Sequence, residues 1–346
     1  MAVSVDVPSL GNEVTASARE EGSRLPLFLE PANETLRTSA EEASRWMAEH
    51  AEAFDRVLAD AGAIVLRGFP IRSTDDFQLL TRHLPPLEMG YAGGNAPRAA
   101  VKGNVMESTR ADPSLLIYLH QEMAYNPQYP SRIAFLCNVA SETGGETIIA
   151  DVREIEKRLP GELVAGVKAL GIRYIRNFRS ADRSTGNKIM DDFHNSWTGA
   201  FKTEDKHEVE EICAARGVDY SWQPDGSLTL VSDLPGFRTH PISGNEVWFN
   251  QMHTMALKPP VITVEMDQAM EDFYSTSDMT RPYSGQYGDG SPIPLELLQA
   301  VSAVFDELTV GFRWQDGDVM FVDNLHTAHG RNPFTGARDV QVQVFA

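Results

Sequence analysis

The first strong hydrophobic pattern in the chain is helical. Between residues 39 and 61, apolar side chains recur at the spacing of one helix face: Trp46, Met47, Phe54, Val57 and Leu58. Ser39 can cap this helix, and Glu42 follows at capping-box spacing. A short buried strand is predicted at residues 63–69, and Ser73 is expected to open a second helix.

From residue 91 onward, short apolar runs alternate with Gly, Pro, Asn and Asp, a pattern typical of strands joined by turns. Strands are predicted at residues 115–123, 132–139, 146–151, 172–178, 228–231, 246–251, 317–324 and 338–345. Helical patterns interrupt them near residues 151–169, 204–216 and 293–308. The chain therefore favours a mainly β fold with helical decoration, built on a β-sandwich.

The strand pattern leaves one leading segment and two long polar segments. Residues 1–38 are weakly patterned, and we expect an irregular N-terminal arm there. Residues 39–346 are expected to form a single domain, since we find no internal repeat or low-complexity linker in the sequence. Long loops in compact domains are often functional, so residues 179–205 and 275–292 are predicted to be lid segments.

The net charge of the chain limits the kinds of partner that it is expected to bind. Among 346 residues, 49 acidic side chains outnumber 30 basic ones, which gives a formal net charge of −19 at pH 7. Such a surface disfavours nucleic acid and anionic membranes. Two cysteines make no disulfide framework, and we find neither a long apolar run nor an N-terminal signal pattern in the sequence. A cytoplasmic globular protein is the expectation.

Two His-x-Glu triplets offer candidate metal ligands, and the predicted elements separate them. His50 and Glu52 lie in the predicted helix, where side chains two positions apart point in different directions, so we expect both to be solvated. His120 and Glu122 follow the strand-like run LLIYL (115–119), and side chains two positions apart on a strand share a face. His120 and Glu122 can therefore reach one metal ion.

The best third ligand is His329, which lies just past a predicted strand in the segment FVDNLHTAHGRNPFTGAR. Two histidines and one carboxylate on one face of an octahedral ion form the facial triad of non-haem Fe(II) oxygenases. This arrangement leaves three coordination positions open. A bidentate 2-oxo acid can take two of them, and dioxygen can take the third.

Two segments of the sequence together resemble a known family. The passage LHQEMAYNPQYPSRIAFLCNVASETGGETIIAD (119–151) and the C-terminal DNLHTAHGRNPFTGAR (323–338) resemble the TauD/TfdA-like superfamily of Fe(II)- and 2-oxoglutarate-dependent oxygenases. The resemblance is greatest to the natural-product branch, which includes syringomycin aspartyl hydroxylase and clavaminate-synthase-like hydroxylases. It implies a double-stranded β-helix (jelly-roll) core, whose two sheets hold the metal between them and exclude water.

The resemblance also implies roles for individual residues. The family's metal ligands match at His120, Glu122 and His329. Thr147 and Arg338 match the threonine and the arginine that bind the distal carboxylate of 2-oxoglutarate. A guanidinium suits a buried carboxylate because it can form two parallel hydrogen bonds with it. Arg331 is a rival for the carboxylate role and is alternatively a group that orients a ligand or contacts substrate.

The remaining histidines and the cysteines receive other interpretations. His326 is less suited than His329 as a ligand, because the family pattern places the ligand five residues after the Asn of the Asp-Asn pair. His253 lies in a segment similar to the pocket-lining strand of the family, and we expect a structural or supporting role. Cys137 and Cys213 are expected to pack as small apolar side chains.

The substrate contacts are the least constrained part of the predicted site. The candidates are Asn104, Met106, Ser108, Tyr125, Asn126, Asn250 and Arg281. Val342 stands where taurine-type members carry a second arginine, so a sulfonate substrate is not expected. Glu122 is present where related halogenases have Ala or Gly, so halogenation is not expected either.

The expected function is an oxygenase that uses Fe(II), 2-oxoglutarate and O2 to hydroxylate an unactivated C–H bond. The expected substrate is an amino acid or an amino-acid-derived small molecule of specialised metabolism. An aminoacyl group tethered to a carrier protein, desaturation and cyclisation are alternatives within the class. A non-oxidative cupin-type metal protein is a more distant alternative, and it would not need Thr147 and Arg338 to converge with the metal ligands. The sequence is compatible with a homo-oligomer.

Overall fold

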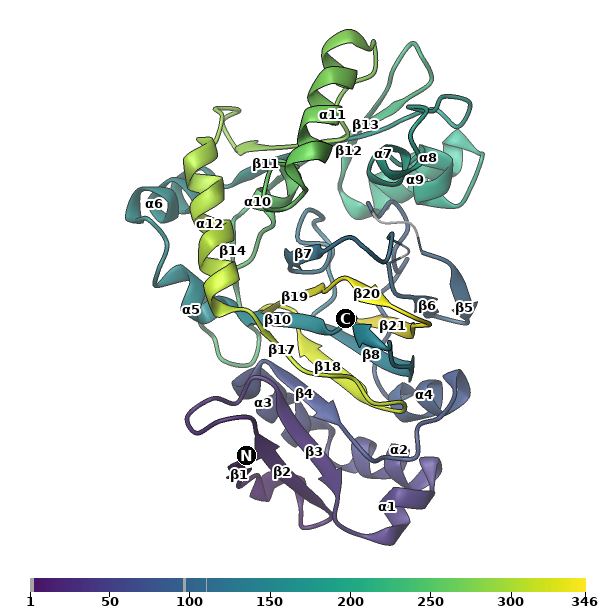
Figure 1. The fold of residues 1–346 in the computed structure, drawn as a ribbon, viewed down its shortest axis with the longest axis vertical. Helices are drawn as coiled ribbons and strands as arrows, with labels where there is room; N and C mark the ends of the chain where they lie inside the picture. Colours follow the sequence, from purple (N-terminus) through teal and green to yellow (C-terminus); the bar gives the residue numbers. More distant parts are fainter. Residues whose placement is uncertain (1–2, 96–97, 110) are drawn as a thin grey trace.

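The largest sheet joins strands from both ends of the chain (Figure 1). In spatial order it contains β1 (Val3–Val5), β2 (Val14–Ala18), β3 (Leu27–Pro31), β4 (Ala63–Leu66), β18 (Val319–Asp323), β8 (Arg132–Val139), β21 (Asp339–Phe345), β6 (Val105–Glu107) and β5 (Ala100–Lys102). Neighbouring strands run antiparallel, except that β3 and β4 are parallel. The structure, a computed structural model, describes residues 3–95, 98–109 and 111–346.

The N-terminal segment extends this sheet and is not the irregular arm that we expected for residues 1–38. Leu27 of β3 pairs with Ile64 of β4, which connects the segment to the centre of the sheet. Leu27 and Leu29 are fully buried, and Val14 and Ala16 of β2 belong to the same apolar cluster. The alternation of buried and exposed positions covers only a few residues in each of these strands. A pattern this short does not distinguish a strand from irregular structure.

Helices pack against this end of the sheet: η1 (Pro8–Leu10), α1 (Glu34–Thr38), α2 (Ala40–Glu49), α3 (Ala51–Ala61) and α4 (Thr74–Thr81). The single helix predicted at residues 39–61 is two helices, because the backbone of His50 leaves the helical conformation (φ −105°, ψ 12°). The predicted caps are confirmed. Ser39 accepts a hydrogen bond from the backbone N–H of Glu42 (3.2 Å), and Ser73 caps α4 in the same way.

A second sheet faces the first. It has the order β17 (Val310–Gly311), β10 (Thr147–Asp151), β19 (Thr327–Arg331) and β7 (Ile117–His120), with antiparallel neighbours. One apolar cluster takes side chains from both sheets: Ile133, Phe135, Ile149, Met320, Val340 and Val342. The centre of the molecule is therefore two layers of sheet with a shared core.

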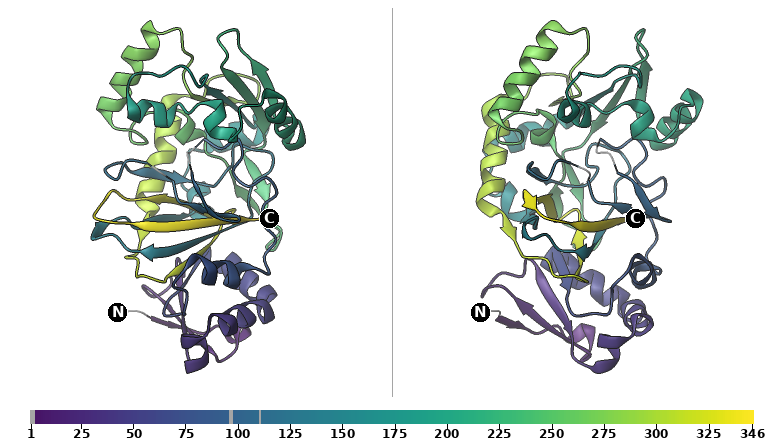
Figure 2. Two further views of the ribbon diagram at one scale, coloured as in Figure 1. Left: turned by 90° about the vertical axis from the view of Figure 1, so that its right-hand side faces the viewer. Right: turned by 45° about the vertical axis from the view of Figure 1, so that its right-hand side comes forward.

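A long insertion between β10 and β17 forms the other end of the molecule. Its strands are β11 (Ile172–Phe178), β12 (Asp219–Trp222), β13 (Leu228–Leu234), β14 (Phe237–Thr239), β15 (Glu246–Trp248) and β16 (Tyr283–Tyr287). In all views, the insertion and the N-terminal helices lie at opposite ends of the central strands (Figures 1 and 2). A short pair, β9 (Thr143–Gly144) and β20 (Phe334–Thr335), precedes β10 and β21 along the chain.

The helices of the insertion are α5 (Val152–Glu156), α6 (Gly161–Leu170), α7 (Lys188–Phe193), α8 (Trp197–Phe201), α9 (Lys206–Arg216), α10 (Met252–Met255), α11 (Val264–Thr276) and α12 (Leu295–Leu308). The helix predicted at residues 151–169 is split in two, because Pro160 lies between α5 and α6. The two predicted lid segments are not plain loops, since the first contains α7 and α8 and the second contains β16. No helix in the described part of the chain is long and apolar enough to cross a membrane.

Candidate functional site

Three side chains that are distant in sequence meet where β7 lies beside β19. The ligand atoms of His120, Glu122 and His329 all lie within 4.8 Å of one another. The strand register places His329 opposite His120, and their ring centroids are 4.5 Å apart. His329 Nε2 lies 3.5 Å from Glu122 Oε2. Two imidazole nitrogens and one carboxylate that converge in this way could hold one divalent metal ion.

Glu122 does not lie on the strand that we predicted for it. β7 ends at His120, and Glu122 follows in a turn where Met123 has a φ of 57°. A shared strand face therefore does not orient Glu122. Its backbone is held by a side chain instead: Asn324 Oδ1 accepts from the Glu122 N–H (2.7 Å), and Asn324 Nδ2 donates to the Glu122 carbonyl oxygen (3.0 Å).

Hydrogen bonding and charge determine the protonation states of His120 and Glu122. His120 Nδ1 lies 2.8 Å from the Tyr118 carbonyl oxygen, which can only accept, so Nδ1 carries the proton and Nε2 keeps its lone pair. Burial and the nearby His329 lower the pKa of His120 to about 4. Burial would raise the pKa of Glu122, but Arg98, 3.1 Å from Oε2, and both histidines lower it to about 2. A neutral imidazole and an ionised carboxylate are the forms that bind metals.

A narrow chamber of about 30 Å³ borders the two histidines. Its lining includes Arg98, Ser108, His120, Thr147, His329, Arg331 and Arg338. No acidic side chain is among the described residues that line it, so the chamber suits an anion. Thr147 is buried on β10, and its Oγ1 accepts from the indole N–H of Trp314 (3.3 Å), which leaves the hydroxyl proton for another acceptor.

Arg338 and Arg331 differ in how many hydrogen bonds their guanidinium groups make to the rest of the protein. Arg338 Nε donates to the Gly145 carbonyl oxygen (3.0 Å), and Nη1 lies 3.4 Å from Ser108 Oγ. Burial, and then the proximity of Arg331, lowers the pKa of Arg338 to about 10, so it remains a cation near pH 7. The guanidinium of Arg331 instead donates to three carbonyl oxygens of the segment that leads into β7, those of Ala111, Asp112 and Leu115. Arg338 is therefore the better placed of the two to bind a ligand.

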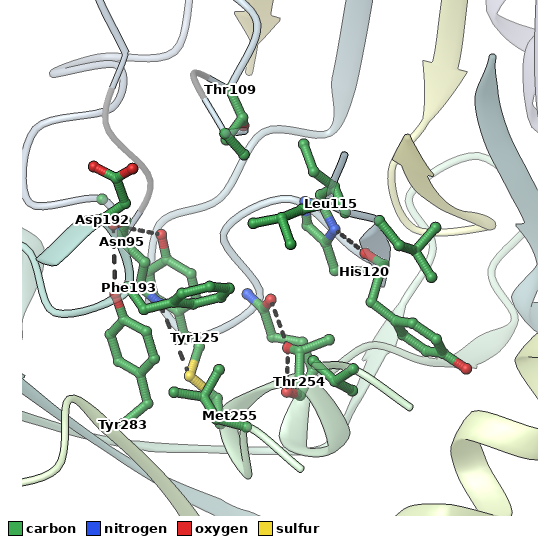
Figure 3. A pocket seen from close by; sticks show the side chains of 18 of the residues that line it. Asn95, Thr109, Leu115, His120, Tyr125, Asp192, Phe193, Thr254, Met255 and Tyr283 are labelled. Carbon is green, nitrogen blue, oxygen red and sulfur yellow. Dashed lines mark hydrogen bonds between the residues drawn. The ribbon is translucent and has the colours of Figure 1, made fainter. Parts of the chain in front are cut away.

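A wider chamber of about 190 Å³ borders His120 and Glu122 (Figure 3). Most of its wall is apolar or aromatic: Leu115, Ile117, Tyr125, Ile189, Phe193, Met255, Leu257, Val261 and Tyr283. Its polar groups include Asn95, Arg98, Asp192, Gln251 and Thr254. The insertion supplies one wall, and both predicted lid segments contribute to it through Phe193 and Tyr283. Described residues between positions 91 and 125 supply much of the rest.

Two of the predicted substrate contacts lie at these chambers, and five do not. Tyr125 lines the wide chamber, and its hydroxyl accepts from the backbone N–H of Asn95 (3.1 Å). Ser108 lines the narrow chamber. Asn104 and Asn250 line neither chamber, and protein groups engage their amides: Asn104 Oδ1 accepts from Gln343 (2.7 Å), and Asn250 Nδ2 donates to a backbone carbonyl oxygen (3.0 Å).

The other three predicted contacts are also engaged away from the chambers. Met106 lies on β6 and packs against the apolar cluster between the two sheets. The side-chain oxygen of Asn126 accepts from Arg176 (3.0 Å). Arg281 forms an ion pair with Glu271 (2.6 Å) and lines neither chamber.

Arg98 is the main functional residue that the sequence analysis missed. It borders both chambers, pairs with Glu122, and lies with its guanidinium carbon 4.2 Å from the centre of the Tyr91 ring. Its segment, GGNAPR, has no hydrophobic period and reads as loop. No local sequence pattern indicates this arginine, and only the fold places it beside Glu122.

A second group of possible ligands, His240, Asp323 and His326, has a geometry that does not suit a metal. The rings of His240 and His326 are stacked, with centroids 3.9 Å apart and 10° between their planes. The lone pair of a ring nitrogen lies in the plane of the ring, so parallel rings at this spacing do not point at one ion. His240 Nε2 also donates to Asp323 Oδ2 (2.8 Å), because Nδ1 accepts from backbone N–H groups. The structure thus separates His326 from the ligand cluster.

The remaining histidines of interest have structural contacts. His253 is buried, and its Nε2 lies 2.9 Å from the Leu119 carbonyl oxygen, next to His120 in sequence. His50 was expected to be solvated but is half-buried at the junction of α2 and α3, where Nδ1 lies 2.9 Å from the Trp46 carbonyl oxygen. Glu52, its partner in the first triplet, is exposed.

Sequence comparison extends over most of the chain. The model of the family "Taurine catabolism dioxygenase TauD, TfdA family" matches residues 31–344. The dapdiamide synthesis protein DdaC of Enterobacter agglomerans is 32% identical over 308 residues, which cover 89% of this chain and 88% of that protein. A clavaminate synthase-like protein of Arabidopsis thaliana is 29% identical over 290 residues, which cover 83% of this chain and 82% of that protein.

Solved structures share the fold at low sequence identity. PvcB of Pseudomonas aeruginosa superposes with a TM-score of 0.53 at 14% identity, covering 97% of this chain and 92% of that one. A taurine dioxygenase from Burkholderia xenovorans superposes with a TM-score of 0.51 at 15% identity, covering 96% and 89%. Together with the extent of the family match, these comparisons show that the chain belongs to the TauD/TfdA family and is an Fe(II)- and 2-oxoglutarate-dependent dioxygenase.

Proposed function

We propose that this enzyme hydroxylates a C–H bond of an amino acid or an amino-acid-derived small molecule. The observation that carries the proposal is the position of the cluster of His120, Glu122 and His329 at the border of two different chambers. One chamber is narrow and lined by cations, and the other is wider and mostly apolar. A co-substrate anion and an organic substrate can therefore approach one metal ion from separate spaces.

The cluster fits the metal that the family uses. His120 Nε2 has a free lone pair, Glu122 is ionised, and His329 Nε2 lies beside Glu122 Oε2. These three residues would hold Fe(II) and leave positions open for other ligands. When bound, the ion together with 2-oxoglutarate and dioxygen supplies the oxidising power for attack on an unactivated C–H bond.

The narrow chamber suits the distal carboxylate of 2-oxoglutarate. Arg338 would pair with the distal carboxylate, and Thr147 would donate its hydroxyl proton to the same group. Arg331 supports the chamber by holding the segment of residues 111–115, and it adds positive charge to the wall. The distal carboxylate of 2-oxoglutarate would be buried here, so the loss of its cationic partner would weaken binding strongly.

The wide chamber would hold the substrate and exclude water from it. Its apolar wall favours a substrate with a hydrocarbon part, whereas Arg98 and Asp192 offer one positive and one negative group. An amino acid or its derivative carries groups that match both. The similarity to a protein of dapdiamide synthesis supports a role in specialised metabolism. We also propose that the two facing sheets form the double-stranded β-helix of the family.

The test is succinate release from 2-oxoglutarate with Fe(II) and a panel of free amino acids, followed by mass spectrometry of the products. The proposal predicts succinate formation coupled to the gain of one oxygen atom by a panel member. Loss of two hydrogens would favour desaturation or cyclisation, and activity only on an aminoacyl carrier protein would favour a tethered substrate. No consumption of 2-oxoglutarate with any of these substrates would contradict the proposed substrate class.

A matched pair of variants ties the activity to the cluster. Glu122→Gln keeps the shape of the side chain but removes the anionic ligand, so turnover should be lost. Glu52→Gln makes the same change in the other His-x-Glu triplet, where Glu52 is exposed, and turnover should be retained. Retained turnover in Glu122→Gln would overturn the ligand assignment.

A further inference from the structure

A small cavity borders Gly93, whose neighbours Gly94 and Asn95 line the wide chamber. Its lining includes Gly93, Asn126, Arg176, Cys213 and Arg216. The volume is about 10 Å³, which is room for a single water-sized species. It has no residue in common with the described lining of the two chambers of the active site.

Two arginines at this cavity are buried without a counter-ion. Arg176 is 1% exposed and Arg216 is 4% exposed. In the described part of the chain neither forms an ion pair with a carboxylate, and their hydrogen bonds go to backbone carbonyl oxygens and to side-chain amides. Burial lowers the pKa of both guanidinium groups. Buried charges are ordinarily paired, so this arrangement calls for a negative partner.

The unpartnered polar atoms at the cavity are all donors. Arg216 has two of them, Nε and Nη1, and Asn126 has one, Nδ2. The orientation of the Asn126 amide is fixed, because Arg176 Nη2 can only donate and therefore faces Oδ1 (3.0 Å). A water molecule could accept two of these hydrogen bonds, but it would bring two protons of its own. No unpartnered side-chain oxygen of a described lining residue is there to receive them.

We propose that this cavity binds one halide ion, with chloride as the physiological occupant. A monatomic anion accepts hydrogen bonds without donating any, fits the volume, and supplies the charge that two buried guanidinium groups lack. The ion would contact the unpartnered donors of Arg216 and Asn126 and would lie close to Arg176. The site is separate from the metal cluster and does not depend on the proposed substrate.

The hydrogen bonds of the two arginines connect the cavity to the active site. Arg216 Nη2 donates to the Gly90 carbonyl oxygen (2.9 Å), and Arg176 Nη1 donates to the Gly93 carbonyl oxygen (2.7 Å). The guanidinium of Arg176 also lies 4.4 Å from the centre of the Tyr125 ring, which lines the wide chamber. An ion that holds both guanidinium groups in place therefore stabilises this wall of the chamber.

The test is thermal unfolding of the Fe(II)-loaded protein under anaerobic conditions, in sodium chloride or bromide and in sodium gluconate of equal ionic strength. We expect a saturable rise in Tm with halide, of about 2 °C at a tenfold excess over the Kd. Arg216→Gln removes the free donors and should abolish the rise. Arg158→Gln removes an exposed guanidinium that pairs with Glu307, and it should leave the rise unchanged.

A second measurement keeps the proposal testable if Arg216→Gln does not fold. Crystals of the wild-type enzyme soaked in bromide should give an anomalous scattering peak inside the cavity. Absence of that peak would mean that the cavity holds water, and it would overturn the proposal. A rise in Tm that persists in Arg216→Gln would place the halide elsewhere, for example at the iron, and would overturn it as well. Neither readout requires catalytic turnover.

Discussion

The side-chain amide of Asn324 makes two hydrogen bonds with the backbone of Glu122, at 2.7 Å to the N–H and 3.0 Å to the carbonyl oxygen. Asn324 directly follows β18 of the large sheet, and Glu122 follows β7 of the second sheet. A third bond, from Asn324 Nδ2 to the Pro130 carbonyl oxygen (2.8 Å), anchors the amide. A candidate metal ligand outside any strand thus gains a fixed position from a residue of the Asp-Asn pair.

Removal of this amide should weaken metal binding. In Asn324→Ala the turn that carries Glu122 loses both hydrogen bonds, and we expect the affinity for Fe(II) to fall roughly 10- to 100-fold, as for other groups that support metal ligands. Anaerobic equilibrium dialysis measures the affinity, with thermal unfolding as a check on folding. Asn138→Ala removes an amide that binds Asp339 instead, and it should bind Fe(II) like the wild type. An unchanged affinity in Asn324→Ala would contradict this support role.

Arg338 should determine the affinity for 2-oxoglutarate. Arg338→Ala leaves the distal carboxylate without its buried cationic partner, and we expect the KM for 2-oxoglutarate to rise roughly 10- to 100-fold. Arg331→Ala should instead lower the Tm, because its guanidinium holds three backbone carbonyl oxygens. Arg173→Ala, at an exposed ion pair with Asp233, serves as the control. If Arg331→Ala raised this KM and Arg338→Ala did not, Arg331 rather than Arg338 would bind the distal carboxylate.

Stability should fall as the pH is lowered from 6.5 towards 4. Burial lowers the pKa of His194 and of His253 to about 4, from an ordinary value of 6.5. Between these values the unfolded chain binds protons at both histidines and the folded chain does not, so acidification favours unfolding. Each group contributes up to about 1.4 kcal/mol per pH unit. Urea unfolding across this range measures the slope.

A single substitution can isolate one of these contributions. His253→Phe removes a titrating ring that stacks on Phe305 and keeps an aromatic side chain there. The slope of stability against pH should become smaller in this variant, whatever its absolute stability. Equal slopes in the wild type and in His253→Phe would show that His253 titrates normally in the folded state.

The apolar wall of the wide chamber should keep substrate in and water out. Phe193→Ala opens this wall, so we expect a higher KM for the substrate and more succinate released per molecule of product. The KM for 2-oxoglutarate should stay the same, because Phe193 does not line the narrow chamber. Val264→Ala, at an exposed position on α11, is the control. If Phe193→Ala released no more succinate per molecule of product than the wild type, this side chain would not shield the site.

The candidate ligands could be predicted from sequence because their spacing and motifs are local. His120, Glu122 and His329 meet in space as their motifs predict, although a shared strand face does not account for the position of Glu122. The sequence predicted a strand through residue 123, whereas β7 ends at His120. The support from Asn324 is a contact between distant segments, and no local pattern indicates it.

Other parts of the fold and site depend on long-range contacts as well. The strands within residues 3–38 are short, and they join the sheet in series: β1 pairs with β2, β2 with β3, and β3 with β4. Their own pattern therefore does not predict them. Asn104 and Asn250 seemed free to bind a substrate, yet protein groups engage both amides. Arg98 was overlooked because its loop has no period, and only the fold places it beside Glu122.

The most direct test of the central claim compares two neighbouring histidines. Fe(II) and 2-oxoglutarate are added anaerobically to the wild type, His329→Gln and His326→Gln, and the visible charge-transfer absorption of a chelated 2-oxo acid is recorded. The predicted result is a band in the wild type and in His326→Gln, because His326 contacts the Ala59 carbonyl oxygen rather than the cluster, and no band in His329→Gln. A band that persists in His329→Gln, or one that only His326→Gln abolishes, would contradict the assignment of the metal site.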